Sequence, residues 1–198
     1  MSVCGNWQKY QSRNPLQRLL LRNFLNTVMA LTRSLQTSTV LDAGCAEGFV
    51  SQRLLEERSD TLIVGIDVDM EALARGRELH PAVMFKPGDV NALPFADRSF
   101  DLVICNEVLE HLAHPELALS ELQRVTRHYC LISVPHEPLF RLSNLLRGKN
   151  LSRLGDDEDH WQHWGALAFR RLASRYFHPL ASRYPFPWQV FLGAVDHW

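Results

Sequence analysis

Short, continuous apolar runs alternate with helix-like segments through the middle of the chain. The five runs, each followed by a polar turn, are Thr39–Ala43, Leu62–Ile66, Val83–Phe85, Leu102–Cys105 and Tyr129–Val134. Strands without a polar face are typical of a parallel sheet that helices cover on both sides. The alternation therefore predicts an α/β fold built on a doubly wound sheet.

The segments on either side of this region complete the predicted domain. Pro15–Leu35 carries apolar residues at helical spacing, and Pro15 suits a first helical turn, so an N-terminal helix precedes the sheet. Tyr176–Tyr184 and Trp188–Ala194 predict a C-terminal antiparallel hairpin that brings the sheet to seven strands. At 198 residues, 46% of them hydrophobic, the chain has the size and core of one domain, 1–198.

Charge and cysteine usage narrow the classes of function. Residues 1–38 contain five bases and no acids, whereas 39–135 contain sixteen acids and eight bases, which disfavours a nucleic-acid partner. Four scattered cysteines (Cys4, Cys45, Cys105 and Cys130) without a C-x-x-C pair favour thiols in a reducing cytoplasm. Leu16–Leu31 is too polar to span a bilayer, and the N-terminus lacks a signal-peptide pattern. We expect a cytoplasmic chain without a membrane span.

Small and acidic residues stand where the predicted strands end, which is where open α/β sheets bind ligands. The four segments are Asp42-Ala43-Gly44-Cys45-Ala46-Glu47-Gly48, Gly65-Ile66-Asp67, Gly88-Asp89-Val90 and Cys105-Asn106-Glu107. Glycines allow a tight turn and a close approach to a ligand. An acid at position 67 can accept from both hydroxyls of a ribose, and one at position 89 from an adenine amino group. Turn-forming or helix-capping acids are the alternative reading of each position.

A dinucleotide-binding enzyme is the nearest rival. Its G-x-G-x-x-G/A fingerprint is not met, because Ala46 and Phe49 stand where small glycine-like residues are needed. Asp42 would also repel a pyrophosphate at this strand end. S-adenosylmethionine carries an ammonium, a carboxylate and a sulfonium but no phosphate, so the pattern favours it over NAD.

These segments resemble the motifs of class I S-adenosylmethionine-dependent methyltransferases, of the small-molecule, methyltransferase domain 11 type. Val40–Gly48 is similar to the first motif, Gly65–Asp67 to the second, Gly88–Phe95 to the third and Phe100–Leu112 to the fourth. The resemblance covers residues 39–134, and it departs from the family at Ala46, where a glycine is usual.

The resemblance implies a Rossmann-like fold, S-adenosylmethionine as cofactor and specific roles for the strand ends. Gly44 and Gly48 would lie near the methionine moiety, Asp67 on the ribose, Val68 against the adenine and Asp89 on its amine. The full candidate donor set is Asp42, Gly44, Cys45, Ala46, Gly48, Asp67, Val68, Asp89, Val90, Asn106 and Glu107. The chain then divides into a helical arm (1–37), a donor-binding half (38–135), an insertion or lid (136–164) and a C-terminal helix and hairpin (165–198).

The predicted activity is methyl transfer to an oxygen, nitrogen or carbon atom of a small-molecule acceptor. Positioning can supply much of the catalysis, and a general base is needed only for a protonated nucleophile. The candidate bases, where loops and insertion should meet, are His111, His136, His160 and His163. An anionic or aromatic acceptor would suit two further groups: Arg141, Arg147, Lys149 and Arg153, and Trp161, Trp164, Phe186 and Trp188. Surface or core packing is the alternative for each group.

Two other functions remain open. One is a donor-fold protein without catalysis that acts as a binding or partner subunit. The other follows from Glu107-x-x-Glu110-His111, which is similar to a metal-binding motif of small-RNA 2′-O-methyltransferases, with Asp159-His160 as its later part. Because the same Glu-Val-Leu-Glu-His-Leu run is common in metal-free small-molecule methyltransferases, we predict no metal. We expect Pro15–Leu35 and 136–164 to cover the acceptor.

Overall fold

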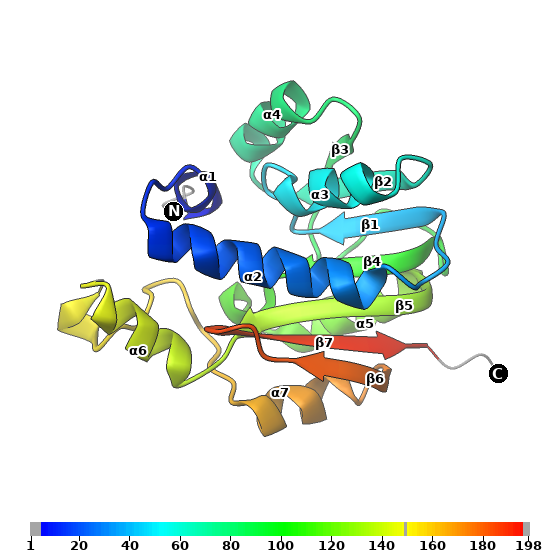
Figure 1. Cartoon of the computed structure of the whole chain (residues 1–198). Coiled ribbons are helices and arrows are strands. Elements are labelled where there is room, and N and C mark those ends of the chain that lie inside the picture. Colours follow the sequence, from blue (N-terminus) through cyan, green and yellow to red (C-terminus); the bar gives the residue numbers. More distant parts are fainter. Residues whose placement is uncertain (1–4, 149, 196–198) are drawn as a thin grey trace.

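One mixed sheet of seven strands, in the order β3-β2-β1-β4-β5-β7-β6, organises the chain in a computed structural model that describes residues 5–148 and 150–195 (Figure 1). The strands are β1 Thr39–Ala43, β2 Leu62–Asp67, β3 Met84–Pro87, β4 Phe100–Asn106, β5 Thr126–Pro135, β6 His178–Arg183 and β7 Trp188–Ala194. Neighbouring strands from β3 to β5 are parallel, and β7 runs antiparallel to both β5 and β6. The predicted doubly wound sheet with a C-terminal hairpin is confirmed. Cys4 and Lys149 lie outside the described residues.

Helices cover both faces of this sheet. They are α1 Gly5–Tyr10, α2 Pro15–Thr32, α3 Phe49–Glu57, α4 Met70–Leu79, α5 Pro115–Val125, α6 Leu139–Leu146 and α7 Ala166–Ala173, with short 3₁₀ turns at Leu109–His111 and Leu151–Arg153. Buried side chains of α2, α3 and α4 form one cluster against the sheet, and those of α5 and α7 form the other. This two-sided burial explains why the parallel strands read as continuous apolar runs.

The predicted N-terminal helix, α2, is chiefly a core helix. Asn14 caps it by accepting from the Leu16 and Gln17 N–H groups, and Pro15 occupies its first turn. Phe24 and Val28 are buried against the sheet. Most of α2 thus lies over a sheet face, and only its first turns approach the edge at which β1 ends (Figure 1).

Two segments lie at the edge of the sheet where the parallel strands end (Figure 1). One is α1, which the sequence pattern did not indicate, because Trp7–Arg13 is polar and short. The other is the insertion, which contains α6 and the 3₁₀ turn at Leu151–Arg153. Asn144 is buried and donates to the Gly155 carbonyl at 2.8 Å, which folds the insertion back on itself.

The helices carry no sign of a membrane span. Among those of the described ranges, none is both long and apolar enough to cross a bilayer.

Candidate functional site

A tight turn joins β1 to α3 and depends on residues in the left-handed backbone region. Gly44 and Gly48 have φ of +78° and +79°. A Cβ at Gly44 would also lie 2.3 Å from Val108 Cγ2, so this turn packs directly on the segment that follows β4. Ala46 has φ of +46°, which favours glycine and accounts for the family preference there. The turn therefore brings two strand ends into contact, as a ligand site at this edge requires.

Asp67, at the end of β2, organises the same turn. Its carboxylate accepts from the N–H of Ala46 at 2.8 Å and from the N–H of Asp69 at 2.9 Å. Val68, the next residue, is an apolar side chain that is 72% exposed. A carboxylate beside an exposed apolar surface fits a ribose followed by an adenine base.

Asp42, at the end of β1, is buried and accepts from the Ser51 hydroxyl at 2.6 Å. Burial raises the pKa of Asp42 to about 6, and the carboxylate of Asp67 adds to the shift. Asp42 therefore titrates just below neutral pH, and a nearby cation would favour its ionised form.

We expect affinity for S-adenosylmethionine to fall as the pH drops below about 6. The ammonium of this ligand favours ionised Asp42, so binding below that pH must expel a proton, at a cost of up to about tenfold per pH unit. The effect of pH on folding has the opposite sign. Because the pKa of Asp42 is higher in the folded protein than in the unfolded chain, neutral Asp42 contributes to the free energy of unfolding at low pH, and this contribution is lost as the pH rises through about 6. Calorimetry between pH 5 and 8 measures the effect on binding. Asp42→Asn should flatten the profile, and an unchanged slope in that variant contradicts the assignment.

The third predicted strand end forms a turn. Asp89 Oδ1 accepts from the backbone N–H of Asn91 at 2.8 Å, and Val90 is buried. The turn-forming role considered for this acid is therefore present, and contact with an adenine would be additional to it.

The end of β4 and the residue that follows it also offer polar groups near the glycine turn, since the next residue, Val108, packs on Gly44. Asn106 accepts from the Ser133 hydroxyl at 2.8 Å, while its buried Nδ2 has no partner among the described residues. Glu107 has φ of +55°, and both of its carboxylate oxygens lie 2.6 Å from Lys9 Nζ. A buried amide without an acceptor is costly, so Asn106 is suited to a ligand oxygen. These features fit the methionine end of S-adenosylmethionine.

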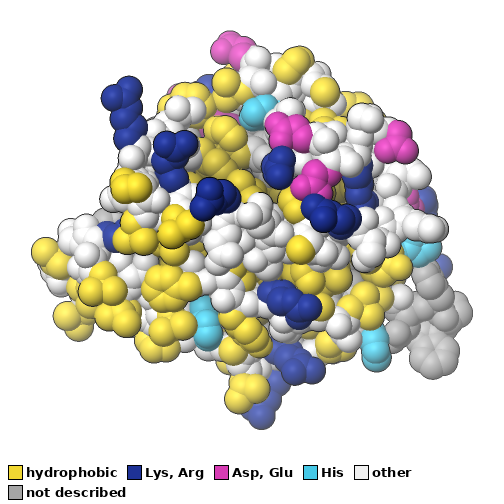
Figure 2. Space-filling model, viewed as in Figure 1, with side chains coloured by type: hydrophobic (Ala, Val, Ile, Leu, Met, Phe, Trp, Pro, Cys, Tyr) yellow, Lys and Arg dark blue, Asp and Glu magenta, His cyan; other side chains and the backbone are white. Residues whose placement is uncertain are grey.

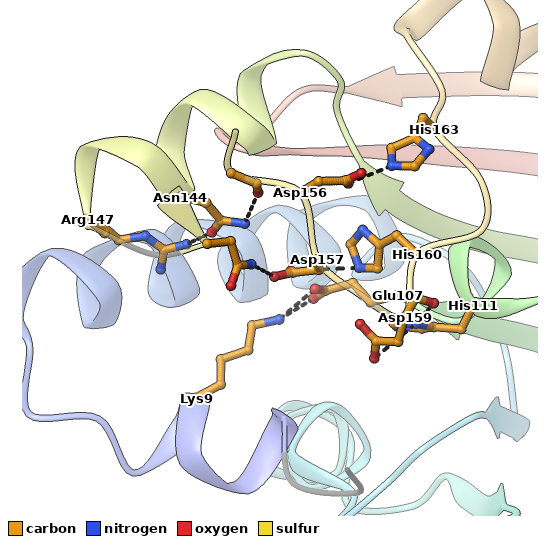
Figure 3. Close-up of polar contacts among 12 residues, drawn as sticks. Lys9, Glu107, His111, Asn144, Arg147, Asp156, Asp157, Asp159, His160 and His163 are labelled. Carbon is orange, nitrogen blue, oxygen red and sulfur yellow. Dashed lines mark hydrogen bonds and ion pairs between the residues drawn. The ribbon is translucent and has the colours of Figure 1, made fainter. Parts of the chain in front are cut away.

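Three of the four candidate histidines gather beside this segment. The His111 and His160 rings are 4.9 Å apart and those of His160 and His163 6.4 Å apart, between the end of β4 and the insertion (Figure 3). The fourth, His136, lies against the C-terminal hairpin, with its ring 5.5 Å from that of Tyr184. The loop after β5 turns towards β7 first, because the His136 N–H donates to the Pro187 carbonyl.

The environments of the gathered histidines differ. His163 Nε2 lies 2.7 Å from Asp156 Oδ1, and His111 Nδ1 lies 3.1 Å from the Asp159 carbonyl oxygen. His160 has a side chain only 6% exposed. Burial, and then the nearby His111, lower the pKa of His160 below its usual value. His160 is therefore neutral at pH 7 and able to accept a proton.

Glu110 belongs to the Glu107-x-x-Glu110-His111 motif but is not among the predicted donor-binding residues or the candidate bases. The residue is 1% exposed, and neither carboxylate oxygen has a hydrogen-bond partner among the described residues. Burial, followed by the charge of Glu107, raises its pKa well above the usual value. Ligand atoms of Glu110, His111 and His160 lie within 4.8 Å of one another, so this cluster could hold a divalent cation. Only the fold reveals this burial, because the sequence shows merely an acid on a short turn.

The arginines considered as an anion clamp bind within the insertion. Arg141 and Arg153 form ion pairs with Asp156 at 2.9 Å and with Glu158 at 3.4 Å. Arg147 donates to the Asn144 side chain at 2.6 Å. These contacts stabilise the insertion. Because each guanidinium already has a partner, it is less available to bind an anionic acceptor.

The aromatic residues do not form one pocket. Trp188 is buried beneath Lys9, 4.9 Å from the ring centroid, and Trp164 packs against the core. Trp161, by contrast, is 72% exposed. The aromatic residues therefore do not line a single pocket, because Trp188 belongs to one core cluster and the half-buried Trp164 packs against the other.

A cavity of about 740 Å³ lies between α1, α2 and α3 and includes no predicted donor residue in its lining. Arg18, Arg22 and Arg53 line it together with apolar residues of α2. Figure 2 shows basic side chains around an apolar hollow on this face. Arg18 and Arg22 of the N-terminal arm therefore lie in this cavity, whereas Lys9 of the same arm lies against Glu107 at the candidate donor site.

Comparison with known proteins agrees with this geometry. A family model described as a methyltransferase domain matches residues 41–132, which include all four strand-end segments. Residues 41–132 form a class I, S-adenosylmethionine-dependent methyltransferase domain. The predicted family and its cofactor, S-adenosylmethionine, are confirmed at this level.

One curated relative illustrates how much of a longer protein this chain matches. A malonyl-[acyl-carrier protein] O-methyltransferase of Erwinia billingiae is 38% identical over 119 residues, 60% of this chain. That match spans 45% of the relative, so the chain covers less than half of its length.

Solved structures share the fold. Magnesium protoporphyrin IX methyltransferase of Synechocystis, solved with bound S-adenosylhomocysteine, has a TM-score of 0.73 at 18% identity, covering 98% of this chain and 91% of its own. A chain from a complex of the Haloferax volcanii Trm112 methyltransferase activator with a methyltransferase has a TM-score of 0.72 at 18% identity, covering 96% of each chain. At this identity the likeness concerns the fold alone.

Proposed function

We propose that this methyltransferase domain transfers the methyl group of S-adenosylmethionine to an oxygen, nitrogen or carbon atom of a small-molecule acceptor. The observation that carries the proposal is the meeting of Asp67, Asn106 and Glu107 around the glycine turn. S-adenosylmethionine would supply a methyl group on a sulfonium: the acceptor atom would bond to the methyl carbon in line as the carbon–sulfur bond breaks, and S-adenosylhomocysteine, a neutral thioether, would be the leaving group. A cytoplasmic location is part of the proposal, because Cys45, Cys105 and Cys130 are buried free thiols.

Each part of the donor has a proposed partner in the chain. Asp67 accepts from the ribose hydroxyls, Val68 packs on the adenine, and Asp89 with Val90 borders its amine. Asn106 donates to the methionine end, and Asp42 favours the ammonium through its negative charge. Cys45 and Ala46 shape the turn between Gly44 and Gly48.

The acceptor is proposed to enter between α1 and the insertion, where His111, His160 and His163 lie. His160, neutral at pH 7, takes a proton from a hydroxyl or amine nucleophile. An acceptor that arrives already ionised, such as a carboxylate, needs only positioning and the exclusion of water. The malonyl-[acyl-carrier protein] relative makes a carboxylate acceptor one candidate to assay.

Donor selectivity is the direct test. We expect isothermal titration calorimetry to detect S-adenosylmethionine and S-adenosylhomocysteine but not NAD, because Asp42 opposes a pyrophosphate and lies by the ammonium of the donor. Binding of NAD without either sulfur ligand overturns the proposal. Donor binding with no methyl transfer over a broad acceptor panel instead supports the non-catalytic partner subunit.

The cluster of Glu110, His111 and His160 favours a second candidate, a metal-dependent enzyme similar to RNA 2′-O-methyltransferases. Glu107, which would complete that motif, is paired with Lys9 and not with the cluster. We therefore expect EDTA to leave methyl transfer unchanged and added Mg²⁺ or Mn²⁺ to have no effect. Loss of activity with chelator, restored by either metal, together with methylation of RNA, would establish the second candidate.

A further inference from the structure

We propose that Lys9, on α1, binds the carboxylate of the donor's methionine moiety, so that α1 completes the donor site. This inference rests on the proposed function, since it assigns a partner to one group of the same ligand. Neither the motifs nor the family match, which begins at residue 41, includes this helix.

Two contacts hold α1 across the glycine turn. The Tyr10 ring stacks on that of Phe49 at 4.2 Å, with 9° between the planes, and Phe49 directly follows Gly48. At the other end of the turn, Lys9 binds Glu107, whose neighbour Val108 packs against Gly44. The side of α1 that carries Lys9 and Tyr10 therefore spans the turn assigned to the methionine moiety.

The turn has few N–H groups left for a carboxylate. The N–H groups of Gly44 and Cys45 both donate to the Ile66 carbonyl, at 2.8 and 2.9 Å. Those of Ala46 and Gly48 donate to Asp67 and to the Cys45 carbonyl. Asp42, Asp67 and Glu107 add negative charge around the same space. A ligand carboxylate here needs a cation, because neither the bonded amides nor the acids can neutralise it.

Lys9 is placed to supply that cation. Arg75 also reaches the turn, but its guanidinium binds the buried Glu47 at 2.9 Å. Lys9 keeps 18% of its side chain exposed, and its ammonium has three donors, so it can hold Glu107 and a second carboxylate together (Figure 3). Glu107 can in turn accept from the donor's ammonium. The Lys9–Glu107 pair then matches the two charges of an amino-acid zwitterion.

A comparison of two ligands tests this assignment. S-adenosylhomocysteine carries the amino-acid carboxylate, whereas 5′-methylthioadenosine lacks the whole amino-acid group but keeps the adenosine. We expect Lys9→Met to weaken S-adenosylhomocysteine binding about 10- to 100-fold, as the loss of a charge-assisted hydrogen bond does, and to change 5′-methylthioadenosine binding less than about twofold. Lys9→Arg should restore most of the affinity.

The other outcomes are equally definite. If Lys9→Met weakens both ligands equally, Lys9 only anchors α1 and the assignment is wrong. If S-adenosylhomocysteine binds Lys9→Met as tightly as the wild type, the carboxylate is held elsewhere, for example by the first turn of α3, and the assignment is again wrong. If the folded wild-type protein binds neither ligand, the proposed function fails and this inference fails with it.

Discussion

Replacing His160 with alanine is expected to slow methyl transfer by about 10²- to 10⁴-fold while leaving the affinity for the donor unchanged, if the acceptor arrives protonated. The physical reason is the burial of this imidazole, which lowers its pKa and keeps it unprotonated at pH 7. Its neighbours His111 and Phe140 fix the ring, at 4.9 and 5.4 Å. The measurement is the single-turnover rate with labelled S-adenosylmethionine and an acceptor found in the panel.

His178→Ala is the matched control, because His178 is an exposed residue of β6 and should be replaceable without loss of rate. In the wild type, activity should also fall at acidic pH, and at a lower pH than the ordinary histidine pKa of about 6.5, because the lowered pKa of His160 keeps this base unprotonated further into the acidic range. A normal rate in His160→Ala, with an unaltered pH profile, would leave positioning alone as the source of catalysis.

Replacing Asp67 with alanine is expected to weaken S-adenosylmethionine binding by about 10- to 150-fold, or roughly 1.5–3 kcal/mol. The change removes the proposed acceptor of both ribose hydroxyls. It also leaves the N–H groups of Ala46 and Asp69 without their acceptor, so the turn loses its side-chain link to β2 but keeps the bonds from Gly44 and Cys45 to the Ile66 carbonyl. Calorimetry with S-adenosylhomocysteine measures the loss without the complication of turnover.

Asp69→Ala separates this effect from a general loss of structure. Asp69 caps α4 by accepting from the N–H groups of Glu71 and Ala72, at 2.9 and 3.1 Å. Its removal should lower the free energy of unfolding by about 1 kcal/mol and leave donor affinity near the wild-type value. If Asp67→Ala and Asp69→Ala both bind the donor with wild-type affinity, Asp67 has no part in ribose recognition.

The strands and the donor-side residues could be predicted because their signals are local. A parallel strand buried on both faces must be apolar along its whole length, which marks Leu62–Ile66 and Tyr129–Val134 without knowledge of their partners. Likewise, a turn at the end of such a strand needs small residues wherever the backbone is left-handed, as at Gly44 and Gly48. Parallel strands end at one edge, so the acids that follow them could be placed together from the sequence.

The acceptor side depends on contacts between distant segments, which no local pattern encodes. α1 is six residues long, too short to be stable alone, and exists through Tyr10 and Lys9 contacts with residues far along the chain. The burial of Glu110 and the approach of His160 to His111 follow from how the insertion folds back over β4. His136 instead meets the hairpin, because its N–H donates to the Pro187 carbonyl. The sequence by itself therefore determined the sheet and the donor edge, through periodicity and turn chemistry. Only the tertiary structure decided which charges and imidazoles meet there, because burial and pairing depend on the packing of the whole chain.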